Sequence, residues 1–171
     1  GKWASLVAGL MEFKELYDQN VPLTQALPGI AAEHGERYAG MGLHDLCAEM
    51  HEGYKQHDIL GSIDAAFSNL PEPVLSPRES FARLVHGEVE KIRVSEMMDR
   101  ILAVQIVPYP PGIPILMPGE RFDKSTQGVG DYLLGLEAFD NNFPGFHNHT
   151  HGIDTEVGPD GKLHYELYCI K

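Results

Sequence analysis

The chain has 171 residues, 43% hydrophobic and 22% charged, a mixture that is ordinary for a globular domain and excludes disordered and fibrous chains. Thirteen Lys and Arg stand against twenty-five Asp and Glu, so the formal net charge of -12 argues against nucleic acid as a partner and suits cationic molecules such as diamines or basic amino acids. Two distant cysteines and the lack of a bilayer-length apolar run favour a reducing, cytoplasmic setting without disulfides or membrane spans.

The first segments predict an amphipathic helix and then an irregular connector. Apolar residues from Trp3 to Tyr17 recur at three- and four-residue steps, which is typical of a helix with one apolar face that ends near Asp18. Residues 21–42 are rich in Gly and Pro and predict a connector with a short helical turn around Ile30. We therefore expect a domain boundary in this connector.

Three further helices are predicted over 43–57, over about 63–70 and from Pro77. The third has the clearest start signal, because Ser76 can cap the free backbone N–H groups and Glu79 can reach back to them. The residues expected to face the core are Leu43, Leu46, Cys47, Met50, Tyr54, Ile63, Ala66, Phe67, Leu70, Phe81, Leu84 and Val85.

Strand patterns follow from residue 91. Residues 91–94 alternate like a half-solvated strand, a helical turn is expected over 95–100, and the apolar run 101–107 predicts a buried central strand. The prolines of 108–114 predict a rigid bend that cannot continue a ladder, followed by a brief edge strand at 115–117.

The last third predicts a helix and a hairpin. Ser125 or Thr126 can cap a helix that ends by Pro144, with inward-facing Val129, Tyr132, Leu133, Leu136 and Phe139. From about Gly152 a hairpin is expected, with its turn at 158–161. Helices precede strands, so we predict an α+β fold in which helices pack on a small, mainly antiparallel sheet.

Two groups of polar residues are candidates for chemistry. His147, His149 and His151 alternate on an extended segment, which favours either a zinc site or ordinary exposed loop histidines. His86 and Glu88 flank Gly87 and form either an acid–base pair or a helix end in which His86 lies in the last turn.

Three other patterns carry less chemistry. Tyr109 in the proline-rich bend is either presented to a ligand or partner or plugs the core. Gly128-Val129-Gly130 lacks the lysine and the strand of a phosphate loop, so close helix packing explains it better. Neither Cys47 nor Cys169 has a catalytic setting, and no GxSxG motif is present.

Several segments together resemble the C-terminal domain of bacterial ornithine/lysine/arginine decarboxylases, fold-type I enzymes dependent on pyridoxal phosphate. The segments that carry the resemblance are GLMEFKELYD (9–18), MGLHDLCAEMH (41–51), LSPRESFARLVHGEVE (75–90), VPYPPGIPILMPGE (107–120), FPGF (143–146) and HG (151–152). The family often carries acidic residues where this chain has 147–149, so the resemblance assigns no role to that loop.

The resemblance implies a decarboxylase of lysine, arginine or ornithine, with a lean toward lysine. The family's cofactor lysine follows Ser-x-His, and no lysine here has that context, so the resemblance implies no catalytic, cofactor-binding or metal residue in this chain and no activity for it alone. It implies that 1–20 end the preceding small domain, 21–42 connect, and 43–171 form the C-terminal domain.

The resemblance also implies partners, namely the rest of the decarboxylase chain, further copies in a homodimer or larger homo-oligomer, and a basic amino-acid substrate. Candidate residues for the active-site entrance or the interface are His86, Glu88, Tyr109, Pro110, Pro111 and Glu120. Two alternatives stay open: a non-catalytic binding or oligomerisation module, and a small metal-dependent hydrolase that uses His147, His149 and His151.

Overall fold

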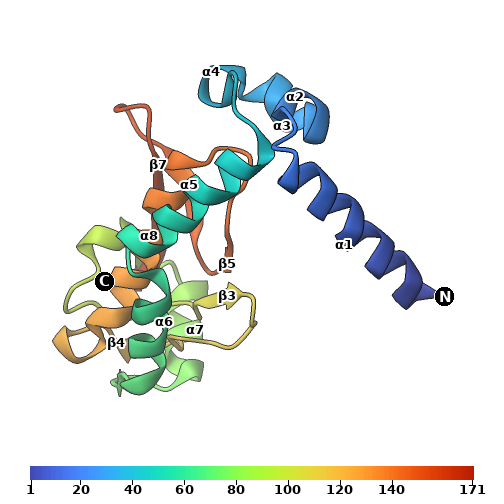
Figure 1. Cartoon of the computed structure of the whole chain (residues 1–171). Coiled ribbons are helices and arrows are strands. Elements are labelled where there is room, and N and C mark those ends of the chain that lie inside the picture. Colours follow the sequence, from blue (N-terminus) through green and yellow to red (C-terminus); the bar gives the residue numbers. More distant parts are fainter. The chain divides into compact units, whose positions relative to one another are not determined.

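The computed structural model describes residues 1–171 and divides them into two compact units, Gly1–Gly53 and Tyr54–Lys171 (Figure 1). The division falls inside a helix, and the domain limits expected at 20 and 42 stay predictions. None of the helices combines the length and the apolar character that crossing a lipid bilayer requires.

The first unit is helical. It contains α1 (Lys2–Asp18), α2 (Leu23–Ala26), α3 (Pro28–Glu33), α4 (Gly35–Tyr38) and most of α5 (Leu43–Gln56). The predicted bounds of α1 and α5 are confirmed within a residue or two. The connector was expected to be irregular with one helical turn, and it forms three short helices instead.

An asparagine fastens the end of α1 to the start of α5. Asn20 donates to the carboxylate of Asp45 at 2.8 Å, and its side-chain oxygen accepts the backbone N–H of His44 at 3.0 Å. Gly42 is required beside it, because a Cβ there would lie 2.0 Å from Asn20 Oδ1. The hydrogen bond from Asn20 is the main reason that the pKa of Asp45 is lowered. This side chain therefore closes the loop that carries α2–α4.

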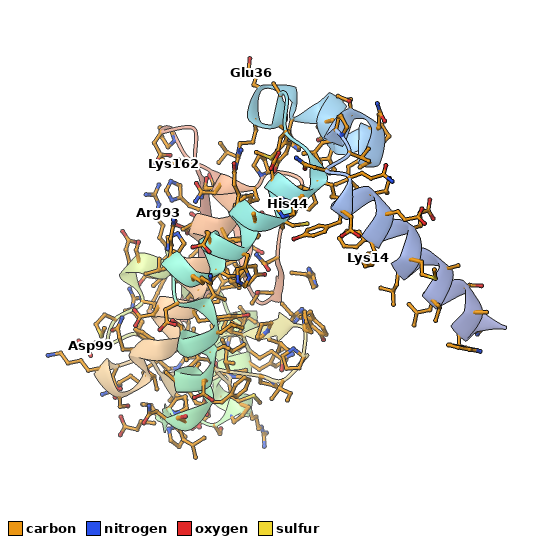
Figure 2. The ribbon with its side chains drawn as sticks, in the orientation of Figure 1. Lys14, Glu36, His44, Arg93, Asp99 and Lys162 are labelled. Atoms are coloured by element: carbon orange, nitrogen blue, oxygen red, sulfur yellow. The ribbon has the colours of Figure 1, made fainter.

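No residue of α1 is buried. Its apolar residues are fully or partly exposed; Trp3, for example, keeps 75% of its surface and Leu6 65%. Figure 2 shows the side chains of this helix, among them Lys14, which pairs with Asp18 one turn later. The amphipathic pattern predicted the helix correctly, but the first unit leaves its apolar face uncovered.

The second unit contains α6 (Ile59–Ser68), α7 (Pro77–Val85), α8 (Gln127–Asn142) and the 3₁₀ turns η1 (Val94–Glu96) and η2 (Lys124–Thr126). All five residues predicted to face inward from α8 are buried. Gly128 and Gly135 lie against α6 and the residues just before it, and a Cβ on Gly128 would stand 2.8 Å from Ala65 Cβ. Close helix packing is therefore confirmed for Gly128 and Gly135, whereas Gly130 lies against the ring of Phe122.

The buried faces of α6 and α7 were predicted largely wrongly. In α6 the buried residues are Ile59, Ser62 and Ala66, of which only Ala66 was predicted. Phe67, and Leu70 just beyond the helix, are exposed. In α7 the buried residue is Ser80, whose hydroxyl donates to Leu102 O at 3.1 Å. Phe81 and Val85 keep more than 60% of their surface. Both helices are short and carry apolar residues on more than one side, so the pattern does not choose the face.

Three small antiparallel sheets complete the unit. Strand β1 (Glu72–Pro73) pairs with β4 (Glu120–Arg121), and β3 (Val107–Tyr109) pairs with β5 (His149–His151). The largest sheet has the order β2-β7-β6, formed by Val89–Arg93, Leu163–Ile170 and Asp154–Val157. The α+β class and the final hairpin are confirmed, although the single expected sheet is three sheets.

The region 101–117 departs from the predicted strands. Leu102 and Ile106 are fully buried, as expected, but they form isolated bridges to Cys169 and Leu116 rather than one continuous strand. Pro108 was expected to lie in a bend that cannot continue a ladder, but it lies in β3 and pairs with Thr150 on β5. The expected edge strand at 115–117 is reduced to the bridge at Leu116. The apolar run predicted burial correctly and the strand incorrectly.

Candidate functional site

The proline-rich bend presents Tyr109 at the end of β3. Tyr109 keeps 54% of its surface, and its ring lies 5.6 Å from the ring of His149 on the paired strand. Gly112 closes the bend by donating its N–H to Pro108 O at 2.8 Å with a φ of +80°. Pro110 and Pro111 are exposed. The core-plug interpretation of Tyr109 is therefore wrong, and the side chain is available for contact.

The second candidate pair lies at the end of α7. His86 is the C-terminal cap, Gly87 has a φ of +73°, and Glu88 donates its backbone N–H to Arg83 O at 2.9 Å while Gly87 donates to Leu84 O at 3.1 Å. These two hydrogen bonds form the Schellman motif that ends a helix. No ion pair joins the side chains of His86 and Glu88, which are exposed, so the helix-end interpretation is confirmed.

Glu120 has a defined local role. Its carboxylate accepts the N–H of Met117 at 2.7 Å, and its backbone oxygen accepts the N–H of Leu102 at 2.8 Å. Both bonds hold the turn between the bend and β4. Glu120 therefore positions the segment that follows the bend.

The histidines of 147–151 do not form a metal site. The structure contains no group of three or more His, Cys, Asp or Glu side chains arranged to hold a metal ion. His149 and His151 pair in register with Tyr109 and Val107, and both are exposed. The metal-dependent hydrolase has no structural support.

The two cysteines are not suited to nucleophilic chemistry, as the sequence predicted. Burial raises the pKa of the Cys169 thiol to about 11 and also raises the pKa of the Cys47 thiol. Both therefore stay protonated and weakly reactive near neutral pH.

A buried polar network lies between α8 and β7. Asp140 is 2% exposed, and its Oδ1 accepts both the backbone and the side-chain N–H of Asn148, at 2.9 and 2.8 Å. Its Oδ2 accepts the phenol of Tyr165 at 2.5 Å. Burial, reinforced by Asp140, raises the pKa of Tyr165 well above its ordinary value. Sequence analysis missed this network, because its three members are far apart in the sequence and match no motif.

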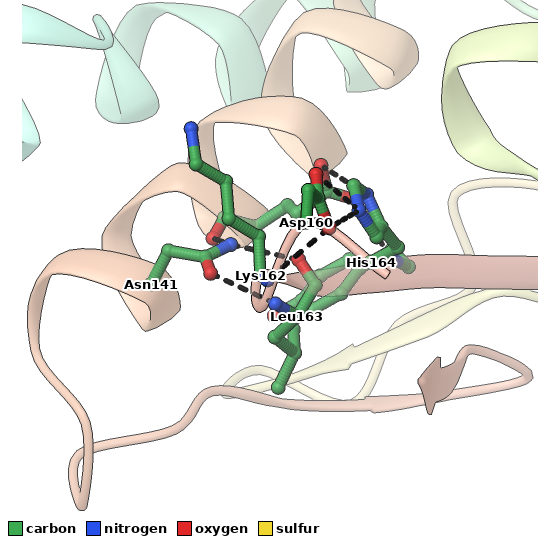
Figure 3. Close-up of polar contacts among 7 residues, drawn as sticks. Asn141, Asp160, Lys162, Leu163 and His164 are labelled. Carbon is green, nitrogen blue, oxygen red and sulfur yellow. Dashed lines mark hydrogen bonds and ion pairs between the residues drawn. The ribbon is translucent and has the colours of Figure 1, made fainter. Parts of the chain in front are cut away.

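A second polar cluster closes the β6–β7 turn (Figure 3). His164 Nε2 lies 3.0 Å from Asp160 Oδ1, and its Nδ1 lies 3.9 Å from Glu137 Oε1 on α8. Gly158 makes room for the imidazole, since a Cβ there would lie 2.8 Å from the ring. The imidazole is thus held between the turn and the helix. The turn residues were predicted, but the contact between His164 and Glu137 on α8 was not.

Asn141 adds a third contact between the same elements. Its side chain accepts the N–H of Leu163 at 2.9 Å and donates to Leu163 O at 2.7 Å, as Figure 3 shows. A paired donor and acceptor on one backbone residue fixes the start of β7 against α8. Strand β7 is therefore anchored to α8 at its first residue, Leu163.

Comparison with known proteins gives a consistent result. Residues 61–171 match the family model described as Orn/Lys/Arg decarboxylase, C-terminal domain. Over its whole length, the chain is 44% identical to a lysine decarboxylase of Pseudomonas aeruginosa, of which it covers 23%. It is 38% identical to a biodegradative arginine decarboxylase of Escherichia coli, of which it covers 22%. An inducible ornithine decarboxylase of Escherichia coli is 36% identical over 99% of the chain and 23% of its own length.

Solved structures agree. The lysine decarboxylase A of Pseudomonas aeruginosa superposes with a TM-score of 0.91 at 44% identity, over the whole chain and 23% of that protein. The constitutive lysine decarboxylase of Escherichia coli has a TM-score of 0.85 at 37% identity, over 97% of this chain and 23% of that one. The chain thus spans less than a quarter of the length of these relatives.

Proposed function

Because the chain belongs to the family of ornithine, lysine and arginine decarboxylases, we propose that it is the C-terminal part of an enzyme that releases the α-carboxyl group of a basic amino acid as carbon dioxide. A proton replaces the carboxyl group, and an amine is left. The observation that carries the proposal is the match over the full chain. The lean toward lysine rests on the names of the similar solved structures.

Pyridoxal phosphate is the cofactor proposed for the parent enzyme, where it would supply an electron sink for the reaction. The residues of this chain do not fit its attachment. All seven lysines are exposed. Lys91 lies 3.1 Å from both Asp154 and Glu166, which raise its pKa, whereas a Schiff-base lysine needs a lowered one. We therefore place the cofactor outside these residues and expect the chain alone to be inactive.

The contribution of this chain is proposed to be contact surface at the active-site entrance and at a subunit interface in a cytoplasmic homo-oligomer. Its best support is the bend, where Tyr109 and Ile113 each keep more than half of their surface and Met117 keeps 38%. Exposed aromatic and apolar side chains of this kind are typical of interface cores. Pro110 and Pro111 stiffen the bend, and Glu120 holds its far end. His86 and Glu88, which are exposed at the end of α7, are proposed as polar contact residues.

The function is tested by expressing the full-length parent with this C-terminus and assaying carbon dioxide release from lysine, arginine and ornithine. We expect decarboxylation of at least one of them by the full-length protein and of none by the 171-residue chain. Borohydride reduction in the presence of pyridoxal phosphate should mark no lysine of the chain alone. A full-length protein that decarboxylates none of the three substrates would refute the proposal.

The interface is tested by Tyr109→Glu in the full-length protein, with Val157→Glu as the matched control. Val157 is 69% exposed on β6, so both changes place a charge on an exposed side chain. For Tyr109→Glu alone, we expect sedimentation velocity to show a smaller assembly or the decarboxylation assay to show a loss of activity. Unchanged assembly and activity would remove the bend from the interface.

A further inference from the structure

An open groove of about 490 Å³ lies where the loop between α5 and α6 meets the middle of α8. The backbone of α8 comes close to this loop at Gly135, where a Cβ would lie 3.3 Å from His57 Cβ. The volume falls within the range of about 300–1,000 Å³ that is usual for small-molecule sites. No step of the proposed decarboxylation uses this groove. It is lined by Gln56, His57, Asp58, Ser62, Asp131, Leu134, Gly135 and Ala138.

Two carboxylates give the groove its charge. Asp58 directly precedes α6 and Asp131 lies on α8, and both residues are exposed. The side chain of Asp58 makes no hydrogen bond or ion pair within the chain, and Gly61 leaves room for it, since a Cβ there would lie 2.5 Å from Asp58 Oδ2. Asp131 accepts a hydrogen bond from the neutral side chain of Gln127 at 2.8 Å. No Lys or Arg lines the groove, so neither carboxylate has a cation beside it.

A buried hydroxyl opens into the same groove. Ser62 is 8% exposed, and its Oγ has no hydrogen-bond partner within the chain. Three buried side-chain atoms lack both a partner and contact with solvent, and Ser62 Oγ is not one of them. This oxygen is therefore reachable from the groove that Ser62 lines, and a ligand can supply the missing bond. Native structures rarely leave a buried polar group unpaired.

Helical spacing places these groups in two facing rows. Ser62 follows Asp58 by four residues, so the carboxylate and the hydroxyl lie on the same side of the start of α6. On α8, Asp131, Leu134 and Ala138 recur at three- and four-residue steps, so an apolar surface continues from the second carboxylate.

The two carboxylates decide which charge the groove prefers. The side chains of Gln56, His57 and Ser62 can each donate or accept a hydrogen bond, so they do not select between ligands of different charge. Ionised carboxylates only accept, and they attract a cation over an anion or a neutral molecule. Because one carboxylate lies on each side of an apolar surface, an aliphatic chain with a positive charge at each end suits the groove.

We propose that this groove binds a linear aliphatic diamine, with one ammonium group at Asp58 and Ser62, the other at Asp131, and the carbon chain over Leu134 and Ala138. An ammonium group has three donors, so it can bond to a carboxylate and a hydroxyl together. Ion pairs with exposed carboxylates are weak, so we expect a dissociation constant on the order of 1 mM. The site stands on the groove alone. That its ligand belongs to the product class of the enzyme rests on the proposed function.

The test uses the full-length protein with methyl-labelled Ala and Leu, titrated with 1,5-diaminopentane and, separately, with uncharged 1,5-pentanediol. The methyl groups of Ala138 and Leu134 line the groove and therefore report binding at this place rather than at a distant site. We expect saturable shifts of both signals with the diamine, weakened by added salt, and none with the diol. Equal shifts with the diol, or no shift of these methyl groups with the diamine, would overturn the proposal.

The charge variants are Asp58→Asn and Asp131→Asn, which remove each carboxylate at nearly constant shape. Asn also tolerates the φ of +43° at position 58. Asp64→Asn is the matched control, because Asp64 is exposed on α6 and does not line the groove. Diamine affinity at the Ala138 methyl should fall about threefold in each single variant and about tenfold in the double variant, and stay unchanged in Asp64→Asn.

The hydroxyl is tested by Ser62→Ala, which should fold normally because the hydroxyl has no partner to lose. Diamine affinity should fall about fivefold, since a hydrogen bond to the ligand is lost. Unchanged affinity in Ser62→Ala or in the double charge variant would refute the site. Decarboxylation is assayed separately, so failure of the site leaves the proposed function standing.

Discussion

The phenol of Tyr165 on β7 donates a 2.5 Å hydrogen bond to Asp140 on α8, and both side chains are at least 98% buried. This bond ties the longest strand of the second unit to its longest helix. It also fixes one side of a cavity between β5, β6 and β7, because Tyr165 is among the residues that line it.

Tyr165→Phe should destabilise the protein by about 1.5–3 kcal/mol, because a buried carboxylate then loses a donor. Urea unfolding followed by circular dichroism measures this change. Tyr168→Phe is the control, since Tyr168 is half-buried on the same strand and its hydroxyl has no hydrogen bond within the chain. Equal effects of the two substitutions would mean that the bond to Asp140 contributes nothing specific.

Asp160→Asn should lower stability at neutral pH and have little effect in acid. In the folded state, the hydrogen bond from His164 and, after it, the backbone N–H of Lys162 lower the pKa of Asp160 below its ordinary value of 3.8. The ionised carboxylate therefore adds stability above its unfolded pKa, and this stability is lost as the pH falls through the folded pKa.

The measurement for Asp160→Asn is the unfolding free energy from pH 7 down to pH 3, beside Asp64→Asn as the control. Asp64 is exposed on α6 and forms no ion pair. The curves of wild type and Asp160→Asn should converge in acid, and Asp64→Asn should track wild type throughout. A gap for Asp160→Asn that stays constant with pH would contradict the role of the charge.

Ser76→Ala should cost about 1 kcal/mol of unfolding free energy, because it removes the cap of α7. Ser76 Oγ accepts the N–H of Glu79 at 3.3 Å, and the Glu79 carboxylate accepts the N–H of Ser76 at 2.9 Å. Thermal unfolding of Ser76→Ala and of Ser95→Ala, an exposed serine without such a bond, provides the comparison. A melting temperature lowered equally in both would argue against the capping box.

Gly152→Ala should destabilise the protein more than Gly161→Ala. Both glycines have positive φ angles, +87° and +73°, so each substitution incurs about 1–3 kcal/mol of backbone strain. A Cβ on Gly152 would in addition lie 2.0 Å from Gln105 O, whereas one on Gly161 meets nothing within 4 Å. Urea unfolding separates the two costs. If Gly161→Ala proved as harmful, φ strain alone would account for both.

The features that could be predicted from the sequence depend on neighbouring residues. The box of Ser76 and Glu79, the inward face of α8 and the 158–161 turn were found because capping, helical spacing and turn chemistry act within a few residues. The buried faces of α6 and α7 could not be found this way. Phe81 and Val85 look like core residues by type, and only the packing of α7 over Leu102 shows that Ser80 is the buried one.

The family could also be recognised from the sequence, because local strings of residues carry the resemblance, whereas the buried network of Asp140 could not be predicted. Asp140 and Tyr165 are 25 residues apart, and nothing in the residues around either one indicates that they meet. Local patterns thus determined the helices, the final hairpin and the class of protein. The tertiary structure decided which apolar faces are covered and which buried polar groups pair, since both depend on contacts between residues distant in the chain.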